Sequence, residues 1–579
     1  MEQTAHAKEF VLCFDGTGYR FRGDEADSNV LKIYRKMLDR HNPNQFHYYQ
    51  PGMGTNTSSI HMSDDNQVGL FKRWYSKAKD AAFGSTFDEH VMAGYRYLIR
   101  FYSPGDRIYI FGFSRGAYVA RILAEMLDYV GLLEAGNEGK VRYIWSVFSQ
   151  WGRDREMDRK EKEDTYKYMK ALRETFCRPV SQIQFMGLFD TVNSIPRFEI
   201  YRNKASLPFT TKTSAKVIRH AVSIDEHRAK FRDNLLSHGA PSAESIRSES
   251  RGHQWNQSLE PELRNHSMKE VSRTKSEARA EYAFYRPAPR SYPQIVNPNH
   301  PLNDSKPRNK TSMHGSTADL TIPANASEFA DRNKHISPGA LHDTIDYPLK
   351  QREDVGQDVE EVWFPGCHAD VGGGLKLEGG ENWALSHVPL VWMVHEAQRA
   401  GLQFDDDKLK QFRCFDHSIS DRSTANSNTR FEGHNFGENS GMDNEVTNER
   451  SQFEFALWKA STSGRMHDCL RFHHGSAWPS VLSWKLVEYL PFRRMSLQKD
   501  GSWKPIRWPL PLGEIRDIPR DAVIHGSAFR RMEADPNYRP KNLVPKKKAK
   551  HRIDRCHISG GWEVHSHHGC PILATYRRS

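Results

Sequence analysis

The stretch RIYIFGFSRGA, residues 107–117, decides the predicted fold of this chain. Residues 107–113 are rich in aromatic and β-branched side chains, which favours a buried strand. Residues 115–130 then place Ala, Leu and Met at helical spacing. Between the two lies Gly112-Phe113-Ser114-Arg115-Gly116, a G-x-S-x-G pattern in a strand–turn–helix setting. Because the glycines allow a sharp turn, we expect Ser114 to expose its hydroxyl above a sheet.

Strands and helices alternate on both sides of this corner. Short apolar runs predict further strands, and amphipathic spacing predicts further helices. The strands are expected at 9–14, 46–50, 183–189 and 359–364, and the helices at 85–102 and 388–400. Such alternation predicts an α/β fold with a mostly parallel sheet and helices on both faces.

Composition divides the 579 residues into packed and polar parts. Segments rich in Ser, Asn, Arg, His and Pro bury too little apolar surface to offset their chain entropy. We therefore predict a largely disordered insertion at 236–356 and a polar loop near 418–450. The predicted organisation is an α/β core in two parts (8–235 and 357–402), a carboxy-terminal subdomain or cap (403–545) that contains the polar loop, and a basic His- and Cys-containing tail (546–579).

The charge balance is basic. A formal net charge of +11 favours weak attraction to anionic surfaces such as phospholipid headgroups, or describes nothing more than a solvated surface. Seven widely spaced cysteines imply no disulfide framework. With no signal-peptide pattern at the start and no long apolar run, we expect a cytoplasmic protein with at most peripheral membrane contact; the basic run Lys546–Arg552 makes a nuclear location the alternative.

Two polar residues at predicted strand ends complete a candidate site for nucleophilic catalysis. A serine hydroxyl needs a base, and the base needs a carboxylate to hold its tautomer. Asp190 follows the run 183–189, and His368 follows 359–364 with a glycine-rich loop behind it. The order Ser114, Asp190, His368 is that of the α/β-hydrolases. Asp370, two residues beyond the base, is the alternative acid.

An acyl-transfer site also needs donors for the oxyanion. The Arg115 amide lies at the start of the predicted helix, and Gly16 and Thr17 lie in the turn Asp15-Gly16-Thr17-Gly18 after the first strand. We predict Gly16, Thr17 and Arg115 as the oxyanion hole, although the turn has a purely structural reading as well.

Metal chemistry is the less favoured reading of the same residues. Asp15, Asp190, His368 and Asp370 are an oxygen-rich set at strand ends, but their spacing matches no compact zinc or calcium motif. Cysteines and histidines between 556 and 570 also fit no standard zinc finger. We therefore expect neither a metal nor another cofactor.

Several segments, taken in order, resemble the α/β-hydrolase domain shared by uncharacterised fungal proteins and the phospholipase effectors of type VI secretion. They are Phe14–Thr17, Gly112–Ala117, Gly187–Val192, His220–Glu226, and Trp363–Gly366 with His368, Asp370 and Gly372–Gly374; Glu488–Pro491 and Ile524–Ser527 resemble the fungal branch. The resemblance implies ester hydrolysis of the lipase or phospholipase type, with Ser114 as nucleophile and His368 as base. The long insertion before His368 departs from the simple domain.

The sequence thus predicts a serine hydrolase that cleaves carboxylic esters, lipid esters first, through an acyl-enzyme. Two alternatives remain: a catalytically silent hydrolase fold that binds a partner, and a metal-dependent hydrolase that uses Asp15, Asp190, His368 and Asp370. Specific nucleic-acid binding is not expected, and the oligomeric state is open.

Overall fold

One central sheet organises the chain in the computed structural model. The structure describes residues 7–19, 21–53, 83–153, 159–192, 213, 215–236, 357–378, 380–414, 445–492, 494–498, 501–543, 561–566 and 570–578. Residues 237–356 of the predicted insertion, the basic run 546–552, residues 418–444 of the predicted loop, and Cys556 and His557 lie outside these ranges.

Within the described ranges the sheet has the strand order β12-β13-β11-β8-β7-β6-β3-β1-β2. Pairing is parallel from β2 to β11 and antiparallel between β11, β13 and β12. The strands are β1 (Glu9–Phe14), β2 (Gln45–Gln50), β3 (Arg107–Phe113), β6 (Phe185–Phe189), β7 (Val217–Ser223), β8 (Asp358–Phe364), β11 (Val523–His525), β12 (Trp562–Ser566) and β13 (Thr575–Arg578). Two small antiparallel ribbons, β4 (Leu132–Leu133) with β5 (Cys177–Arg178) and β9 (Arg494–Leu497) with β10 (Trp503–Ile506), lie outside it.

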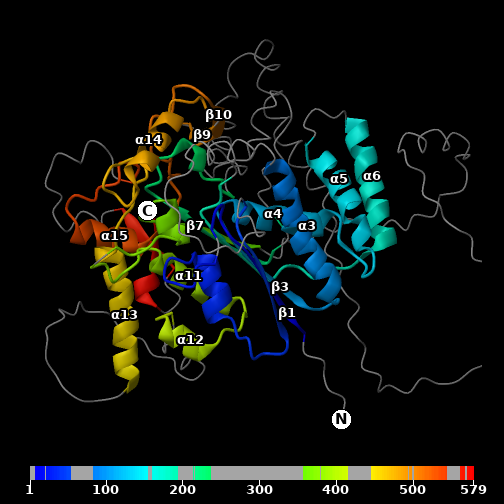
Figure 1. Cartoon of the computed structure of the whole chain (residues 1–579), viewed down its shortest axis with the longest axis horizontal. Coiled ribbons are helices and arrows are strands. Elements are labelled where there is room, and N and C mark those ends of the chain that lie inside the picture. Colours follow the sequence, from blue (N-terminus) through cyan, green and yellow to red (C-terminus); the bar gives the residue numbers. More distant parts are fainter. Residues whose placement is uncertain are drawn as a thin grey trace, which may run out of the picture. The chain divides into compact units, whose positions relative to one another are not determined.

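Helices cover both faces because side chains alternate along each strand. In β1, Phe10 and Leu12 pack into one hydrophobic cluster, whereas Val11 and Cys13 pack into another. Figure 1 shows helices on either side of β1 and β3. The first face carries α3 (Phe83–Phe101), α4 (Arg115–Tyr129), α5 (Val141–Arg153) and α6 (Arg159–Phe176); the second carries α1 (Asn29–Lys32), α11 (His387–Arg399), α12 (Asp406–Gln411) and α13 (Glu445–Ser463).

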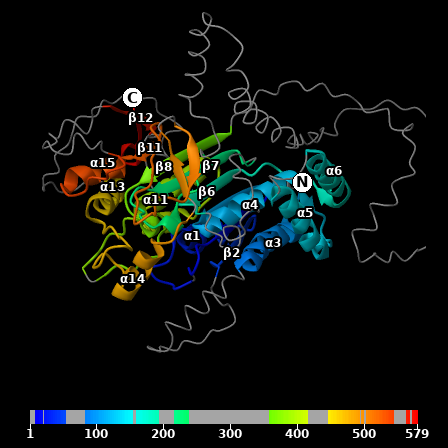
Figure 2. The ribbon, with the colours of Figure 1, turned by 90° about the horizontal axis from the view of Figure 1, so that it is seen from above.

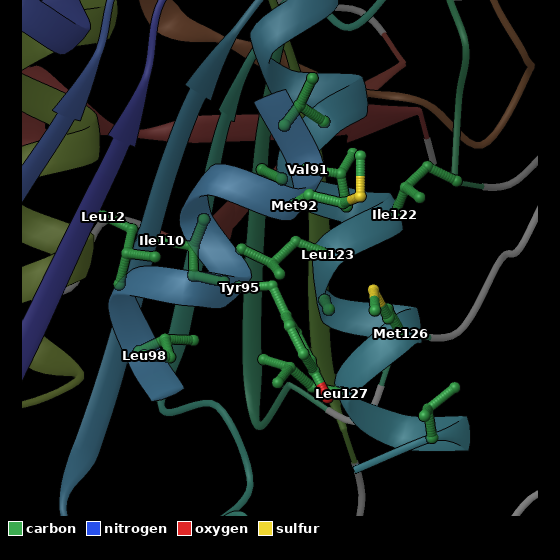
Figure 3. Close-up of a cluster of buried hydrophobic side chains, with 14 of the residues drawn as sticks. Leu12, Val91, Met92, Tyr95, Leu98, Ile110, Ile122, Leu123, Met126 and Leu127 are labelled. Carbon is green, nitrogen blue, oxygen red and sulfur yellow. The ribbon is translucent and has the colours of Figure 1, made fainter. Parts of the chain in front are cut away.

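The first face holds α4, the helix that follows Ser114. Figure 3 shows Leu12 and Ile110 of the sheet beneath Val91 and Tyr95 of α3 and Leu123 of α4, and all five are buried. Removing this apolar surface from water fixes the start of α4 against the sheet. The predicted α/β-hydrolase-like fold, with helices on both faces, is confirmed.

The carboxy-terminal residues extend the sheet beyond β8. The strand β11 pairs with β8 in parallel, and α15 (Gly526–Ala534) packs beside it through Ala528 and Met532. The predicted boundaries of the subdomain stay a prediction. The predicted loop near 418–450 is wrong at its end because α13 begins at Glu445. Residues 445–452 are mostly Glu, Thr, Asn, Arg, Ser and Gln, so this start of the helix looks polar in the sequence.

Candidate active site

Ser114 occupies a strained corner between β3 and α4, where it is buried at 2% exposure rather than exposed as predicted. Its backbone adopts φ 58° and ψ −123°, a combination that residues other than glycine rarely adopt. A Cβ on Gly112 would lie 2.5 Å from the Ala117 Cα, and one on Gly116 would lie 2.3 Å from the Phe14 carbonyl oxygen. Both glycines are therefore required for the close approach of α4 to the strands, as the G-x-S-x-G pattern predicts.

Asp190 ends β6, the strand next to β3. The Ser114 amide donates to the Phe189 carbonyl at 2.9 Å, and the Val192 amide donates to the Ser114 carbonyl at 3.4 Å. These bonds hold the corner beside Asp190. Its carboxylate, fully buried, accepts from the Ser223 amide at 2.8 Å and lies 2.5 Å from Nδ1 of His368.

His368 begins the short helix α10 (His368–Gly372), where the sequence suggested a loop. The imidazole lies between the rings of Phe113 and Phe231, each with its centroid 4.8 Å away. Because an ionised carboxylate only accepts hydrogen bonds, Nδ1 carries the hydrogen and Nε2 is an acceptor. Nε2 is buried and has no hydrogen-bond partner among the described residues. Burial lowers the pKa of His368, and the Asp190 bond opposes this shift, so the ring is neutral at pH 7.

Arg516 is a residue that the sequence reasoning missed. Its guanidinium contacts both oxygens of Asp190, at 2.6 and 3.0 Å, and the Ser223 hydroxyl at 2.8 Å. Burial alone would raise the pKa of Asp190, but Arg516 and then His368 lower that pKa well below its usual range. Asp190 is therefore held ionised and fixed in orientation. No sequence signal marks one arginine 326 residues from its partner.

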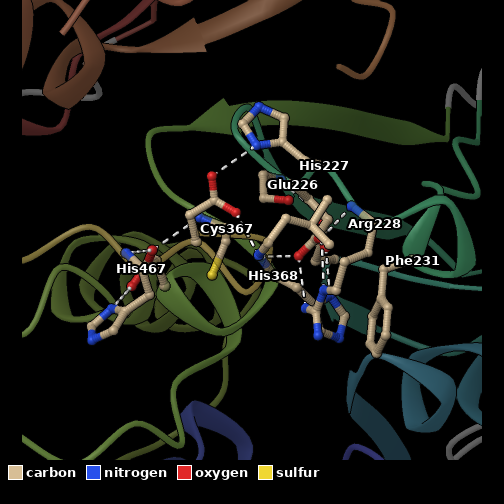
Figure 4. A network of polar contacts seen from close by, with 12 residues as sticks. Glu226, His227, Arg228, Phe231, Cys367, His368 and His467 are labelled. Atoms are coloured by element: carbon tan, nitrogen blue, oxygen red, sulfur yellow. Dashed lines mark hydrogen bonds and ion pairs between the residues drawn. The ribbon is translucent and has the colours of Figure 1, made fainter. Parts of the chain in front are cut away.

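Glu226 and Arg228 form a second ion pair against the same histidine. The Arg228 guanidinium donates twice to Glu226, both times at 2.8 Å, and Glu226 accepts from the His368 amide at 3.2 Å. Despite its burial, Glu226 has its pKa lowered to about 2 by Arg228. Figure 4 shows Glu226, Arg228, Phe231 and His368 side by side in this network. Glu226 lies in a segment that carried the family resemblance, without a predicted role.

Asp370, the alternative acid, contacts a different set of groups. It accepts from the Cys367 and His467 amides, both at 2.9 Å, and from Nδ1 of His467 at 2.7 Å. Asp370 thus caps the start of α10, whereas Asp190 contacts the imidazole of His368.

The predicted oxyanion donors differ in whether their amides already donate a hydrogen bond. The Gly16 amide donates to its neighbour Asp15 at 2.7 Å. The Thr17 amide has no acceptor among the described residues, and the Thr17 hydroxyl is buried without a partner there. Arg115 begins α4, directly after Ser114. Of the two predicted donors in the turn after β1, Gly16 therefore already has an acceptor for its amide and Thr17 does not, among the described residues.

The carboxylates of the alternative metal-site hypothesis do not come together at one site. Asp15 accepts from Ser28 and Tyr49, both at 2.7 Å, and burial raises its pKa to about 6. Over the part of the chain that the structure describes, no group of three or more His, Cys, Asp or Glu side chains is arranged to hold a metal ion. Nor is any helix in those ranges long and apolar enough to cross a membrane.

Matches to known proteins include a yeast relative and two solved structures. The chain is 28% identical over 572 residues to the uncharacterized protein YEL023C of Saccharomyces cerevisiae, covering 93% of this chain and 81% of the yeast protein. A crystal structure of an uncharacterized protein from Pseudomonas aeruginosa matches 72% of this chain at 17% identity with a TM-score of 0.27. The Tle1 effector bound to the VgrG spike of the type 6 secretion system matches 39% at 16% identity with a TM-score of 0.21. The chain spans about half the length of these two solved structures, 48% and 47%.

A family model supplies the decisive match. It describes the catalytic domain of the type VI secretion phospholipase effectors of the Tle1-like kind, and it matches residues 8–396, more than half of the chain. The range contains Ser114, Asp190 and His368, and the resemblance predicted from the sequence is confirmed. The chain therefore belongs to the Tle1-like phospholipase effector family.

Proposed function

We propose that this chain is a serine hydrolase that cleaves carboxylic esters of lipids through an acyl-enzyme. The observation that carries the proposal is the hydrogen bond between Asp190 and Nδ1 of His368, which leaves Nε2 as an unpartnered acceptor. The strained corner at Ser114 is held beside this pair by its bonds to Phe189 and Val192.

The chemistry follows from these groups. Nε2 of His368 takes the proton as the Ser114 oxygen attacks the ester carbonyl, and Asp190 stabilises the imidazolium that forms. The Thr17 and Arg115 amides donate to the oxyanion of the tetrahedral intermediate. His368 gives the proton to the alcohol oxygen as its bond to the carbonyl carbon breaks, which leaves the acyl group on Ser114. Water, deprotonated by the same nitrogen, then attacks the acyl-enzyme, and His368 returns that proton to the Ser114 oxygen as the acid leaves.

A lipid ester is the proposed substrate class because the family consists of phospholipase effectors. The base also lies among aromatic rings: Phe113 and Phe231 contact the imidazole, and the Phe231 ring lies 5.4 Å from that of Trp484. An apolar wall favours an acyl chain over a polar acid.

The test is hydrolysis of phosphatidylcholine and of a soluble short-chain ester by the wild type, Ser114→Ala and Ser149→Ala. Ser149 is a buried serine of α5 and serves as the matched control. We expect Ser114→Ala to lose about 10³-fold or more in kcat and Ser149→Ala to retain activity. Equal activity of Ser114→Ala and wild type would overturn the serine mechanism. If that activity were also lost to a chelator, the metal-dependent alternative would replace it. No hydrolysis by well-folded wild type would favour a silent binding module.

A further inference from the structure

The helix α14 (Trp478–Val487) exposes large apolar side chains on the side where a surface helix normally carries polar ones. Trp478, Leu482 and Leu486 follow one another at four-residue spacing, so they form one stripe, and they are 69%, 48% and 64% exposed. Figure 2 shows α14 at the edge of the described ribbon. Tyr489 and Leu490 continue the stripe beyond the helix.

Neighbouring segments enlarge this stripe into a surface. Leu512, 59% exposed, is tied to the end of α14 by the bond from its amide to the Glu488 carbonyl. Phe472, 43% exposed, lies under the ammonium group of Lys485. We call this surface the α14 face: Phe472, Trp478, Leu482, Leu486, Tyr489, Leu490 and Leu512. Clustered exposure of this kind marks a binding surface rather than scattered apolar residues.

The inner side of α14 reaches the candidate site. Val481 is buried, and the Trp484 ring meets Phe231, which in turn contacts the His368 imidazole. Arg228, the partner of Glu226, lies over both Phe231 and Trp484. Two aromatic rings, those of Trp484 and Phe231, therefore connect the inner side of α14 to the proposed base.

We propose that the α14 face docks on an anionic lipid surface and presents lipid esters to the site of Ser114. The charges around the face support this partner. In the described span 471–492 the exposed charged side chains are Arg471 and Lys485, both basic, whereas the acid Glu488 is buried. Basic residues beside exposed leucines, with Trp and Tyr at the two ends of the stripe, are what an interfacial helix requires.

A second copy of this chain is a poorer occupant. A twofold contact through this face would place Lys485 and Arg471 in the same buried surface as their own copies, where like charges repel. An anionic lipid surface pairs those charges instead.

The test is flotation with vesicles of phosphatidylcholine, with and without phosphatidylserine. All proteins carry Ser114→Ala, so that no lipid is hydrolysed and the vesicles stay intact. The inference rests on the proposed function, but the result of this test does not depend on it. The variant adds Leu482→Ser and Leu486→Ser. The matched control adds Phe455→Ser and Trp458→Ser, an equally exposed pair on α13.

We expect the leucine pair to weaken binding to phosphatidylserine vesicles by roughly tenfold or more, because two exposed apolar side chains no longer enter the lipid. The control pair binds like the parent, and omitting phosphatidylserine or adding salt weakens the parent. Parent-like flotation of the leucine variant, equal loss in the control, or no binding by the parent overturns the proposal. A lower thermal midpoint in the leucine variant alone would show that another part of the chain covers the face. A lipid-free mass that halves in that variant would identify a second copy as the occupant. Either result also overturns the proposal.

Discussion

Asp190 binds three groups at once: the His368 imidazole, the Arg516 guanidinium and the Ser223 amide. These contacts fix the orientation of the Asp190 carboxylate. The Asp370 carboxylate instead contacts the imidazole of His467. This difference separates the two candidate acids by their effect on activity.

Replacing Asp190 by Asn removes the carboxylate that holds the tautomer of His368. We expect Asp190→Asn to lower kcat by about 10³ to 10⁴-fold. Asp370→Asn loosens the start of α10 and lowers the thermal midpoint, with a loss of about tenfold or less in kcat. Steady-state kinetics and thermal unfolding of both variants measure this, and the reverse order of the two kcat losses would make Asp370 the acid.

The pKa of His368 sets the acidic limit of the reaction. Only the neutral ring accepts a proton, and burial lowers its pKa below the ordinary value of 6.5. Hydrolysis is therefore retained through pH 6.5 and lost as the pH falls through the lower pKa. The midpoint of the acidic limb of kcat/KM is expected below pH 6.5 on a soluble ester, and a midpoint above 6.5 contradicts this account.

Arg516 provides the control for that profile. The positive charge of Arg516 partly cancels the effect of the Asp190 charge on the pKa of His368. Its removal in Arg516→Met is expected to raise the pKa of His368 and so to move the acidic limb toward higher pH. Arg516→Lys keeps the charge and moves the limb less. If Arg516 had a purely structural role, its replacement would lower the stability of the fold without moving the acidic limb of the pH profile.

At the scale of elements, the corner between β3 and α4 depends on two glycines. A Cβ at Gly116 would meet the Phe14 and Asp15 carbonyl oxygens at 2.3 and 2.5 Å, and these are backbone atoms of β1 and its turn that cannot swing away. Gly116→Ala is therefore expected to destabilise the fold by about 1 to 3 kcal/mol. Chemical denaturation measures it. Gly139→Ala, where no atom lies within 4 Å, is the matched control, and equal stability of the two variants would refute the close approach.

How well each strand could be predicted depended on an unbroken apolar run rather than on burial alone. The strand β7 is buried but was not predicted, because Arg219 and His220 interrupt its apolar residues. Buried strands such as β1 and β3 were predicted with their observed bounds because apolar runs mark them. The strands β11, β12 and β13 were not, since one has three residues and the others carry polar, exposed side chains. In the site, Ser114, Asp190 and His368 were found because each follows a strand. Arg516 was not, because one arginine among 83 basic residues carries no local signal.

At the scale of the molecule, residues far apart in the chain complete one sheet and one site. Arg516 neutralises Asp190, and β11 covers the edge of β8. A chain ended after residue 510 would leave a buried carboxylate without its cation and β8 without its neighbour. We expect it to lose cooperative thermal unfolding and ester hydrolysis.

A chain ended after residue 543 is the control for this truncation. It keeps Arg516, β11 and α15, and of the described elements it lacks β12, β13 and the short 3-10 helix Pro571–Leu573. We expect it to fold with a lowered midpoint. Should the shorter chain melt cooperatively and hydrolyse ester like the full chain, the carboxy-terminal region is a separate subdomain, as composition suggested.

The central claim is that Ser114 is the nucleophile, and covalent labelling tests it most directly. Trypsin cleaves after Arg107 and Arg115, and the peptide 108–115 contains a single serine. After reaction of the folded protein with a fluorophosphonate, mass spectrometry is expected to find the phosphonyl group on Ser114 in this peptide. An adduct on another residue, or a folded protein that stays unlabelled, would contradict the account.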